Sequence, residues 1–349
     1  MDGDETPFVE ALLAAPAGVA LLARLEAEHR SDVAWFDSPA DSDPAVVSEA
    51  ARSVGTMSFG RMVKLAVEAA ESLAGPWTGD APGPLVGAYR HAAARRPIAE
   101  AVDARFAARL RAPVDLEAQQ WWHTNHPRQG PFDRELFRDF GSVYGNGEFT
   151  WAGLWTATEP PADAHDALVS AWEMFEGPVS RWRLPLRLGA RVWEVHRPGD
   201  WVRLVEAYPK RAVKAHAGWE LPGPNQPDGG LAAELLTVPG QHAMRAHVSR
   251  HVLPDWAAVS ADYDGVHLSW AGFLTTEGYV CDLDAGGVTM LRYWGSERTH
   301  WLADVFGDPV PLGAPVLSGS MSGALGVDVG VDDARRAHDL DVLTKLLVR

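Results

Sequence analysis

Residues 119–126 read QQWWHTNH, and this stretch has the composition of a buried β-strand that ends at a polar edge. Alternation along a strand places Gln120 and Trp122 on one side and Trp121 and His123 on the other. A histidine near the end of such an apolar strand can open toward the edge of a cleft. His123 is therefore a candidate site residue, and the alternative is a histidine at the rim of the core.

The composition of the chain changes just before this stretch. Of the 15 tryptophans, 13 follow residue 115, and only Trp35 and Trp77 precede it. Residues 1–115 are instead dominated by Ala, Leu, Glu and Arg, which are strong helix formers. We expect an α+β chain with three parts: an all-helical domain at 1–115, an α+β domain at 116–312, and a Gly/Pro-rich tail with a C-terminal helix at 313–349. The helical part is expected to be a structural or partner-binding layer.

Individual elements follow from apolar spacing and from turn clusters. In the N-terminal part, we expect helices near Phe8–Leu25, at Pro44–Leu73 and at Leu85–Leu110. Later helices are expected at Asp163–Phe175, Trp201–Ala207, Gln241–Val252 and Asp255–Asp262. Expected strands are Gln119–His123, Phe149–Thr156, Ala190–His196, Gly265–Trp270, Gly278–Leu283, Val288–Trp294 and Arg298–Leu302. Strands and helices do not alternate strictly, which favours an α+β over an α/β arrangement.

Charge and cysteine content narrow the class of protein. The 349 residues carry a net charge of −16, so we expect no general binding to a nucleic-acid backbone. A lone cysteine, Cys281, cannot form an intrachain disulfide and excludes a Cys-rich zinc site. The acidic start has no basic segment of the kind that opens a signal peptide, and Pro16 interrupts the apolar run Ala11–Ala23. We expect a soluble cytoplasmic protein that does not associate with membranes.

Several common enzyme motifs are missing from the sequence. It contains no GxGxxG opening a helix, no Walker A loop, no HExxH and no GxSxG. His247 and His251 are four residues apart on an expected helix, where two imidazoles can chelate a metal. A metal-dependent hydrolase built on the histidines is therefore one alternative, and a non-catalytic Trp-rich binding module is another. A solvated helix face is the plainer interpretation of this histidine pair.

One further histidine and one group of arginines are interpreted as structural before any functional role is considered. His267 lies on an expected buried strand and is interpreted as a core histidine. A basic stripe is interpreted as an exposed strand face with acidic neighbours, or alternatively as a contact to a dinucleotide pyrophosphate. Its members are Arg181, Arg183, Arg187 and Arg191.

Three short segments occur in an order that resembles a known family. They are WWHT at 121–124, GLWTATEPPADAHDALVSAW at 153–172, and ERTHW at 297–301. A histidine on a first strand, an aromatic residue that leads into a helix, and a glutamate that opens a late strand are similar to the ADP-ribosyltransferase superfamily. The resemblance is to its His–Tyr–Glu branch, of the diphtheria-toxin and poly-ADP-ribose polymerase type, over about residues 116–305. Trp155 stands where tyrosine is usual, and Gly295 stands where the Arg–Ser–Glu branch often has a second acid.

The resemblance implies a fold and a reaction. The fold would be a mixed, mainly antiparallel split sheet, and the substrate would be NAD+ with no metal. Glu297 would be the catalytic carboxylate that stabilises an oxocarbenium-like ribose, as carboxylates do in glycoside hydrolysis. His123 would bind the adenosine ribose, and Trp155 would stack on the cationic nicotinamide. The other positions implied in NAD+ binding are Thr124, Gly153 and Thr156. The acceptor of the ADP-ribose stays open between a protein side chain, a nucleic-acid base, a small molecule and water.

Overall fold

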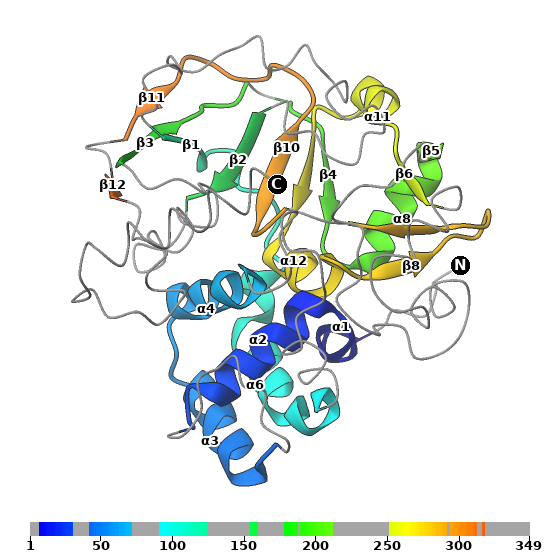
Figure 1. Ribbon diagram of the computed structural model, residues 1–349. Helices are drawn as coiled ribbons and strands as arrows, with labels where there is room; N and C mark the ends of the chain where they lie inside the picture. The colour runs from blue at the N-terminus through cyan, green and yellow to red at the C-terminus, as the bar shows by residue number, and fades with distance from the viewer. Residues whose placement is uncertain are drawn as a thin grey trace, which may run out of the picture.

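A mixed β-sheet lies above a layer of helices in the computed structural model (Figure 1). The structure describes residues 7–30, 42–71, 91–124, 154–159, 178–187, 189–211, 251–291, 294–312 and 316–317. The helices of the N-terminal part form the lower, blue-to-cyan portion of the figure. The α+β class expected from the sequence is confirmed.

The N-terminal helices follow the expected positions but differ in their bounds. They are α1 (Phe8–Ala14), α2 (Pro16–Ala27), α3 (Pro44–Val54), α4 (Phe59–Glu71), the 3₁₀ turn η1 (Ala92–Arg95) and α6 (Arg96–Leu110). The single helix expected at 44–73 is wrong, because the chain breaks after Val54 and starts again at Phe59. Ser58 explains the restart, since its Oγ accepts a hydrogen bond from the Arg61 backbone N–H at 3.0 Å. The segment 85–90 of the third expected helix lies outside the described residues.

The main sheet has the strand order β11-β3-β1-β2-β10-β7-β4, and β12 also pairs with β3. The strands are β1 (Gln119–Thr124), β2 (Leu154–Thr158), β3 (Pro178–Arg183), β4 (Val192–Val195), β7 (Gly265–Leu268), β10 (Arg298–Trp301), β11 (Val310–Pro311) and β12 (Val316–Leu317). β4 and β7 are parallel, and the other pairs are antiparallel. The described strands of this sheet form one continuous hydrogen-bonded path.

Smaller elements cover the β4 edge of the sheet. They are α8 (Pro198–Ala207), α11 (Trp256–Asp262), α12 (Trp270–Thr276), the ribbon of β5 (Pro209–Arg211) with β6 (Val252–Pro254), and the hairpin of β8 (Val280–Asp282) with β9 (Val288–Met290). The strand expected at Gly265–Trp270 ends early, because the Ser269 Oγ accepts from the Gly272 N–H at 3.1 Å and starts α12. The helix expected at Gln241–Val252 overlaps strand β6 at Val252, and its residues 241–250 lie outside the described residues. The helix expected at Asp163–Phe175 also lies outside the described residues.

The pairing register gives the sheet one apolar face and one face on which polar side chains stand beside a second apolar cluster of Trp121, Leu154 and Trp301. On the apolar face, Val266 of β7 lies between Trp193 of β4 and His300 of β10. His267 is the next residue of β7, and it lies between Glu194 of β4 and Thr299 of β10. These three side chains are on the opposite face of the sheet. The sheet therefore has a row of polar side chains on the side away from the helical layer.

One apolar core joins the helices to the sheet. It includes Leu22 of α2 and Val102 of α6 from the N-terminal part, together with Val266 and Phe273 from the α+β part. Helix α12 lies between the sheet and helices α1 and α2 (Figure 1). The boundary expected at residue 115 falls between α6 and β1, but the core continues across it.

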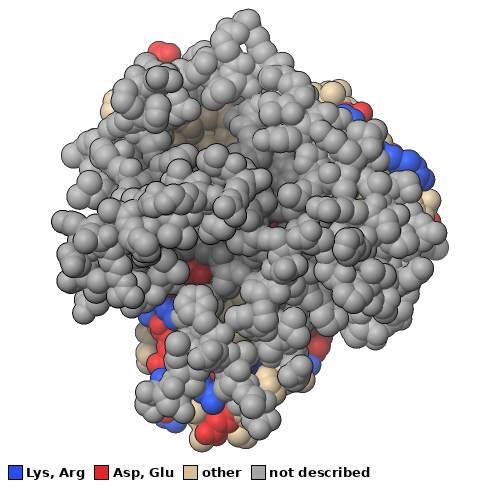
Figure 2. Space-filling model, viewed as in Figure 1, with Lys and Arg blue, Asp and Glu red and all other residues tan. Residues whose placement is uncertain are grey.

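The surface of the helical layer carries mixed charge. Figure 2 shows blue and red side chains interspersed over the lower part of the molecule. Arg61 contacts Glu28 at 2.6 Å, and Arg24 lies 3.5 Å from Glu68. Within the described residues, no single helix is long and apolar enough to cross a membrane, although α1 and α2 together, bent by 87° at their junction, pass the same test of length and composition.

The close approach of α12 to β4 requires glycine at position 272. A Cβ atom on Gly272 would overlap the backbone carbonyl of Val195, which is a rigid part of the sheet. We expect Gly272→Ala to destabilise the fold by about 1–3 kcal/mol, because overpacking a rigid contact forces the backbone to move. Thermal unfolding measures this loss as a lower Tm.

Gly199→Ala is the matched control, since the nearest atom to its added Cβ is 3.9 Å away in the Arg203 side chain. We expect this control to keep or raise the Tm, because alanine is the better helix former. Equal melting of the two variants would contradict the close packing of α12 on β4.

Candidate functional site

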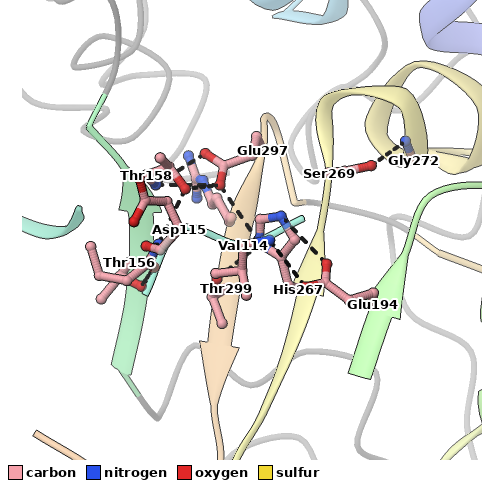
Figure 3. A network of polar contacts seen from close by, with 12 residues as sticks. Val114, Asp115, Thr156, Thr158, Glu194, His267, Ser269, Gly272, Glu297 and Thr299 are labelled. Atoms are coloured by element: carbon pink, nitrogen blue, oxygen red, sulfur yellow. Dashed lines mark hydrogen bonds and ion pairs between the residues drawn. The ribbon is translucent and has the colours of Figure 1, made fainter. Parts of the chain in front are cut away.

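Four ionisable side chains gather at one end of the polar face, and we call them the acid–histidine cluster. The cluster consists of Glu194, His196, His267 and Glu297. Figure 3 shows Glu194, His267 and Glu297 side by side. Strand pairing brings them together, since Glu194 of β4 lies beside His267 of β7 and β10 follows directly. Glu297 immediately precedes β10, two residues before Thr299, and so lies on the same face.

Glu297 is held in place by Thr158 of strand β2. The Thr158 N–H donates to both carboxylate oxygens at 3.3 and 3.2 Å, and the Thr158 hydroxyl donates to Oε1 at 2.8 Å. The Glu297 side chain is only 6% exposed. A carboxyl group fixed in this way keeps one orientation and does not need to reorganise when a charge develops next to it.

A second layer of hydrogen bonds supports Thr158. The Gln119 side-chain amide donates to the Thr158 hydroxyl at 3.2 Å and to the Asp115 carbonyl at 2.9 Å. The Gln119 carbonyl oxygen accepts from Thr156, whose hydroxyl accepts from the Trp301 indole at 2.7 Å. The segment that links α6 to β1 therefore takes part in holding the cluster.

His267 lies between the two carboxyl groups. Its Nδ1 is 3.0 Å from the Thr299 hydroxyl and 3.6 Å from Glu297 Oε1, and its Nε2 is 3.8 Å from Glu194 Oε2. The same Glu194 oxygen is 3.8 Å from His196 Nε2. The other Glu194 oxygen accepts from the Val114 N–H at 3.0 Å.

Burial sets the protonation of the cluster. It raises the pKa of Glu297 to about 7, against the opposing effect of the Thr158 hydrogen bonds. It likewise raises the pKa of Glu194 to about 7, although the Val114 N–H favours the ionised form. Burial lowers the pKa of His267 to about 3, with His196 adding to the effect, so its imidazole is neutral at pH 7. Both carboxyl groups therefore titrate near neutrality around an uncharged histidine.

The structure does not bring the other expected NAD+-binding residues to Glu297. Trp155 lies on the opposite face, where its ring stacks on His300 at 4.5 Å and 17° and meets Trp294 edge-on at 4.9 Å. Thr156 shares the face of Glu297, but its hydroxyl is used by Gln119 and Trp301. An aromatic wall beside Glu297 is therefore not supplied by Trp155.

The expected positions on β1 are far from Glu297 along the sheet. Glu297 is level with Gln119, which pairs with Thr158, whereas His123 pairs with Ser180 four residues further along β1. Four residues of strand span about 13 Å. Thr124 follows His123 at the end of β1, and Gly153 lies outside the described residues.

The sequence predicts Glu297 as a site residue but does not predict the residues that surround it. His267 was interpreted as a core histidine, and its burial at 1% exposure agrees with that, but it also contacts the site. Alternation within Val192–His196 does place Glu194 and His196 on one face. What the sequence does not show is that β4 and β7 pair in parallel across about seventy residues.

The other candidate residues have the following places. Arg183 lies 4.0 Å from Glu159 and Arg191 lies 3.9 Å from Asp264, so these two members of the basic stripe have acidic neighbours. His242 and His247 lie outside the described residues, and His251 is buried. In the part of the chain that the structure describes, no group of three His, Cys, Asp or Glu side chains is placed to hold a metal ion.

Comparisons of the chain with protein-family models, with curated proteins and with solved structures find no match. The acid–histidine cluster is therefore the feature of the molecule from which a function is inferred.

The raised pKa of Glu297 predicts a pH-dependent stability difference. The folded protein binds this proton more tightly than the unfolded chain, so the stability that it contributes at low pH is lost as the pH rises from 4.5 to about 7. Glu297→Gln removes the titration, so the Tm of the variant minus that of the wild type should increase over this range. Expressed as free energy of unfolding, the full change between low and high pH is on the order of 3 kcal/mol.

Thermal unfolding at pH 4.5, 6 and 8 measures this difference. Glu159→Gln makes the same chemical change at a solvent-exposed carboxyl one residue from Thr158 and is the matched control. A constant difference for Glu297→Gln would show that its carboxyl group is not perturbed by burial.

Proposed function

We propose that the α+β part of the chain is an ADP-ribosyltransferase-like domain that cleaves NAD+, with Glu297 as its catalytic carboxylate. The observation that supports this proposal is the Glu297 carboxyl group itself. It is buried at the start of a central strand, oriented by two donors of Thr158 and poised to ionise near pH 7. A buried carboxyl that costs stability and has a strongly shifted pKa is typical of a functional site.

The chemistry requires a carboxylate in a fixed position. The bond between ribose C1′ and the nicotinamide nitrogen breaks, and its electron pair neutralises the departing ring. Positive charge develops on the ribose, and the ionised Glu297 stabilises it. When water is the acceptor, its oxygen bonds to C1′ and it gives up one proton, which Glu297 accepts.

The proposal assigns no role in the chemical step to the other expected residues. Trp155 stacks on His300 away from Glu297, and Thr156 belongs to the hydrogen-bond layer that supports the site. Roles in binding NAD+ for His123, Thr124 and Gly153 remain predictions from the resemblance. Thr158 is added as the residue that orients Glu297.

The tryptophans that the structure describes argue against a binding surface built from them, because most of them are core residues. The tryptophans with the least exposure fill the core: Trp121, Trp122, Trp201, Trp256, Trp270, Trp294 and Trp301. Among the described residues, the one large hydrophobic side chain that is exposed is Val310. The described surface therefore does not present the aromatic patch that a binding module of this kind would need.

We expect Glu297→Gln to abolish NAD+ cleavage while NAD+ still binds, because its carboxylate acts in the transition state. The rate of nicotinamide release should fall by about 10²-fold or more, since loss of one electrostatic stabiliser has this effect. Nicotinamide release and calorimetric NAD+ titration measure the two quantities. Glu159→Gln is the control and should retain the wild-type rate, and full turnover by Glu297→Gln would refute the assignment.

The pH profile tests the protonation state of Glu297 in the reaction. Because the ionised form is the active one, kcat/KM for NAD+ should rise with pH and level off above about 7, following the pKa of this carboxyl group. A profile that falls over the same range would mean that Glu297 acts as an acid, which cleavage of a cationic leaving group does not need.

A further inference from the structure

A continuous series of hydrogen bonds leads from the core to the Glu297 carboxyl group, and we call it the hydrogen-bond chain. Its members are, in order, Trp301 of β10, Thr156 of β2, Gln119 of β1, Thr158 of β2 and Glu297. The first three are completely buried, so protein groups must satisfy their polar atoms. The direction in which each of these hydrogen bonds runs can therefore be worked out from the donors and acceptors present.

The indole of Trp301 sets the direction at the start of the chain. An indole nitrogen has a proton to donate and cannot accept a hydrogen bond. Trp301 Nε1 therefore donates to the Thr156 hydroxyl at 2.7 Å. The Thr156 proton points away from the indole and is donated to Oε1 of Gln119. The Gln119 amide thus turns its oxygen toward Thr156 and its NH₂ group in the other direction.

The backbone carbonyl of Asp115 fixes the same orientation of Gln119 independently. A carbonyl oxygen only accepts, and it lies 2.9 Å from Gln119 Nε2. A flipped amide would bring two acceptor oxygens together at this point. The NH₂ group is therefore the part of Gln119 that faces Thr158, with Nε2 3.2 Å from the hydroxyl oxygen.

This orientation leaves the Thr158 hydroxyl with one direction. Because an amide NH₂ group cannot accept, Thr158 accepts from Gln119 and donates its own proton to Glu297 Oε1 at 2.8 Å. Thr158 and Glu297 face each other in Figure 3. We propose that the hydrogen-bond chain makes the Thr158 hydroxyl a donor only, so that it selects the ionised form of Glu297. Gln119 is the positioning residue of the chain.

Without Gln119, the same hydroxyl would serve both forms of the carboxyl group. A hydroxyl that can rotate donates to a carboxylate and accepts from a protonated acid. With Gln119 in place, accepting from protonated Glu297 would turn the Thr158 proton toward an NH₂ group that cannot take it. An unpaired donor is costly at a buried site, and this cost applies to the protonated form alone. The consequence for catalysis rests on the proposed role of Glu297.

Other charged and titratable groups also face Glu297. His267 of β7 lies 3.6 Å from Oε1, and burial lowers its pKa to about 3, so it is neutral at pH 7. Glu194 of β4 raises the pKa of Glu297, and Arg298 of β10 lowers it. Substitutions in the hydrogen-bond chain leave these three side chains in place.

A double-mutant cycle on the pKa of Glu297 tests the chain without NAD+. Gln119→Met keeps the length of the side chain but cannot donate, and Thr158→Val removes the hydroxyl. We expect Thr158→Val to raise this pKa by about one unit and Gln119→Met by about half a unit to one unit, because a hydrogen bond to the charged form is lost or weakened. The double variant should match Thr158→Val, since Gln119 acts through the hydroxyl.

The pKa is measured by NMR titration of protein with ¹³C-labelled glutamate carboxyl groups, and the signal absent from Glu297→Gln identifies the residue. No shift in Gln119→Met, or an equal shift with and without the Thr158 hydroxyl, would overturn the chain. Val54→Ala is the control for lost stability, because Val54 is buried in α3 of the helical layer. We expect it to keep the wild-type pKa, and a shift as large as that of Gln119→Met would also overturn the proposal.

Nicotinamide release separates this inference from the proposed reaction. In Gln119→Met, the pH at which kcat/KM levels off should rise together with the pKa of Glu297, while KM stays within about twofold. A non-additive pKa shift in a protein that does not cleave NAD+ would support the chain and refute the reaction. Cleavage of NAD+ with the same pH profile in wild type and Gln119→Met would refute the chain and leave the reaction standing.

Discussion

The position of strand β10 between β2 and β7 is the constraint on which the rest of this structure depends. Both pairings of β10 are antiparallel, and together they decide which of its side chains face the helices. In the observed register, Glu297 and Thr299 face the polar side and His300 faces the core. Because side chains alternate along a strand, a slip by one residue would bury the carboxyl group among apolar residues. The register is thus fixed by the cost of burying the wrong face.

The polar face lowers the stability of the fold and at the same time makes it specific. Burial holds two carboxyl groups and one imidazole away from their usual protonation states, which costs free energy. The hydrogen bonds from Gln119 to Thr158 and on to Glu297 satisfy the Glu297 carboxyl group only when β1, β2 and β10 are correctly aligned. The apolar core on the other face offsets the cost.

The sequence predicts local elements better than their partners. The strands around Gln119–Thr124 and Arg298–Trp301 and the helix at Trp256–Asp262 agree closely with the expected positions, because apolar alternation and capping residues are local signals. The break at Gly55–Ser58 and the short α12 were missed, since single capping side chains, Ser58 and Ser269, decide where α4 and α12 start. Glu297 was found from its position at a strand start. Glu194 and His267 were not assigned to the site, because a parallel pair joined by a long connection leaves no local trace.

The continuous core has a consequence for how such a chain can evolve. The helical part and the sheet bury apolar surface against each other through α12, so one core extends across both parts. Recombination at the change of composition near residue 115 would leave both fragments with an uncovered apolar face. A cut near residue 115 is therefore expected to destabilise both parts, and insertions that keep the fold are expected in the connections between elements.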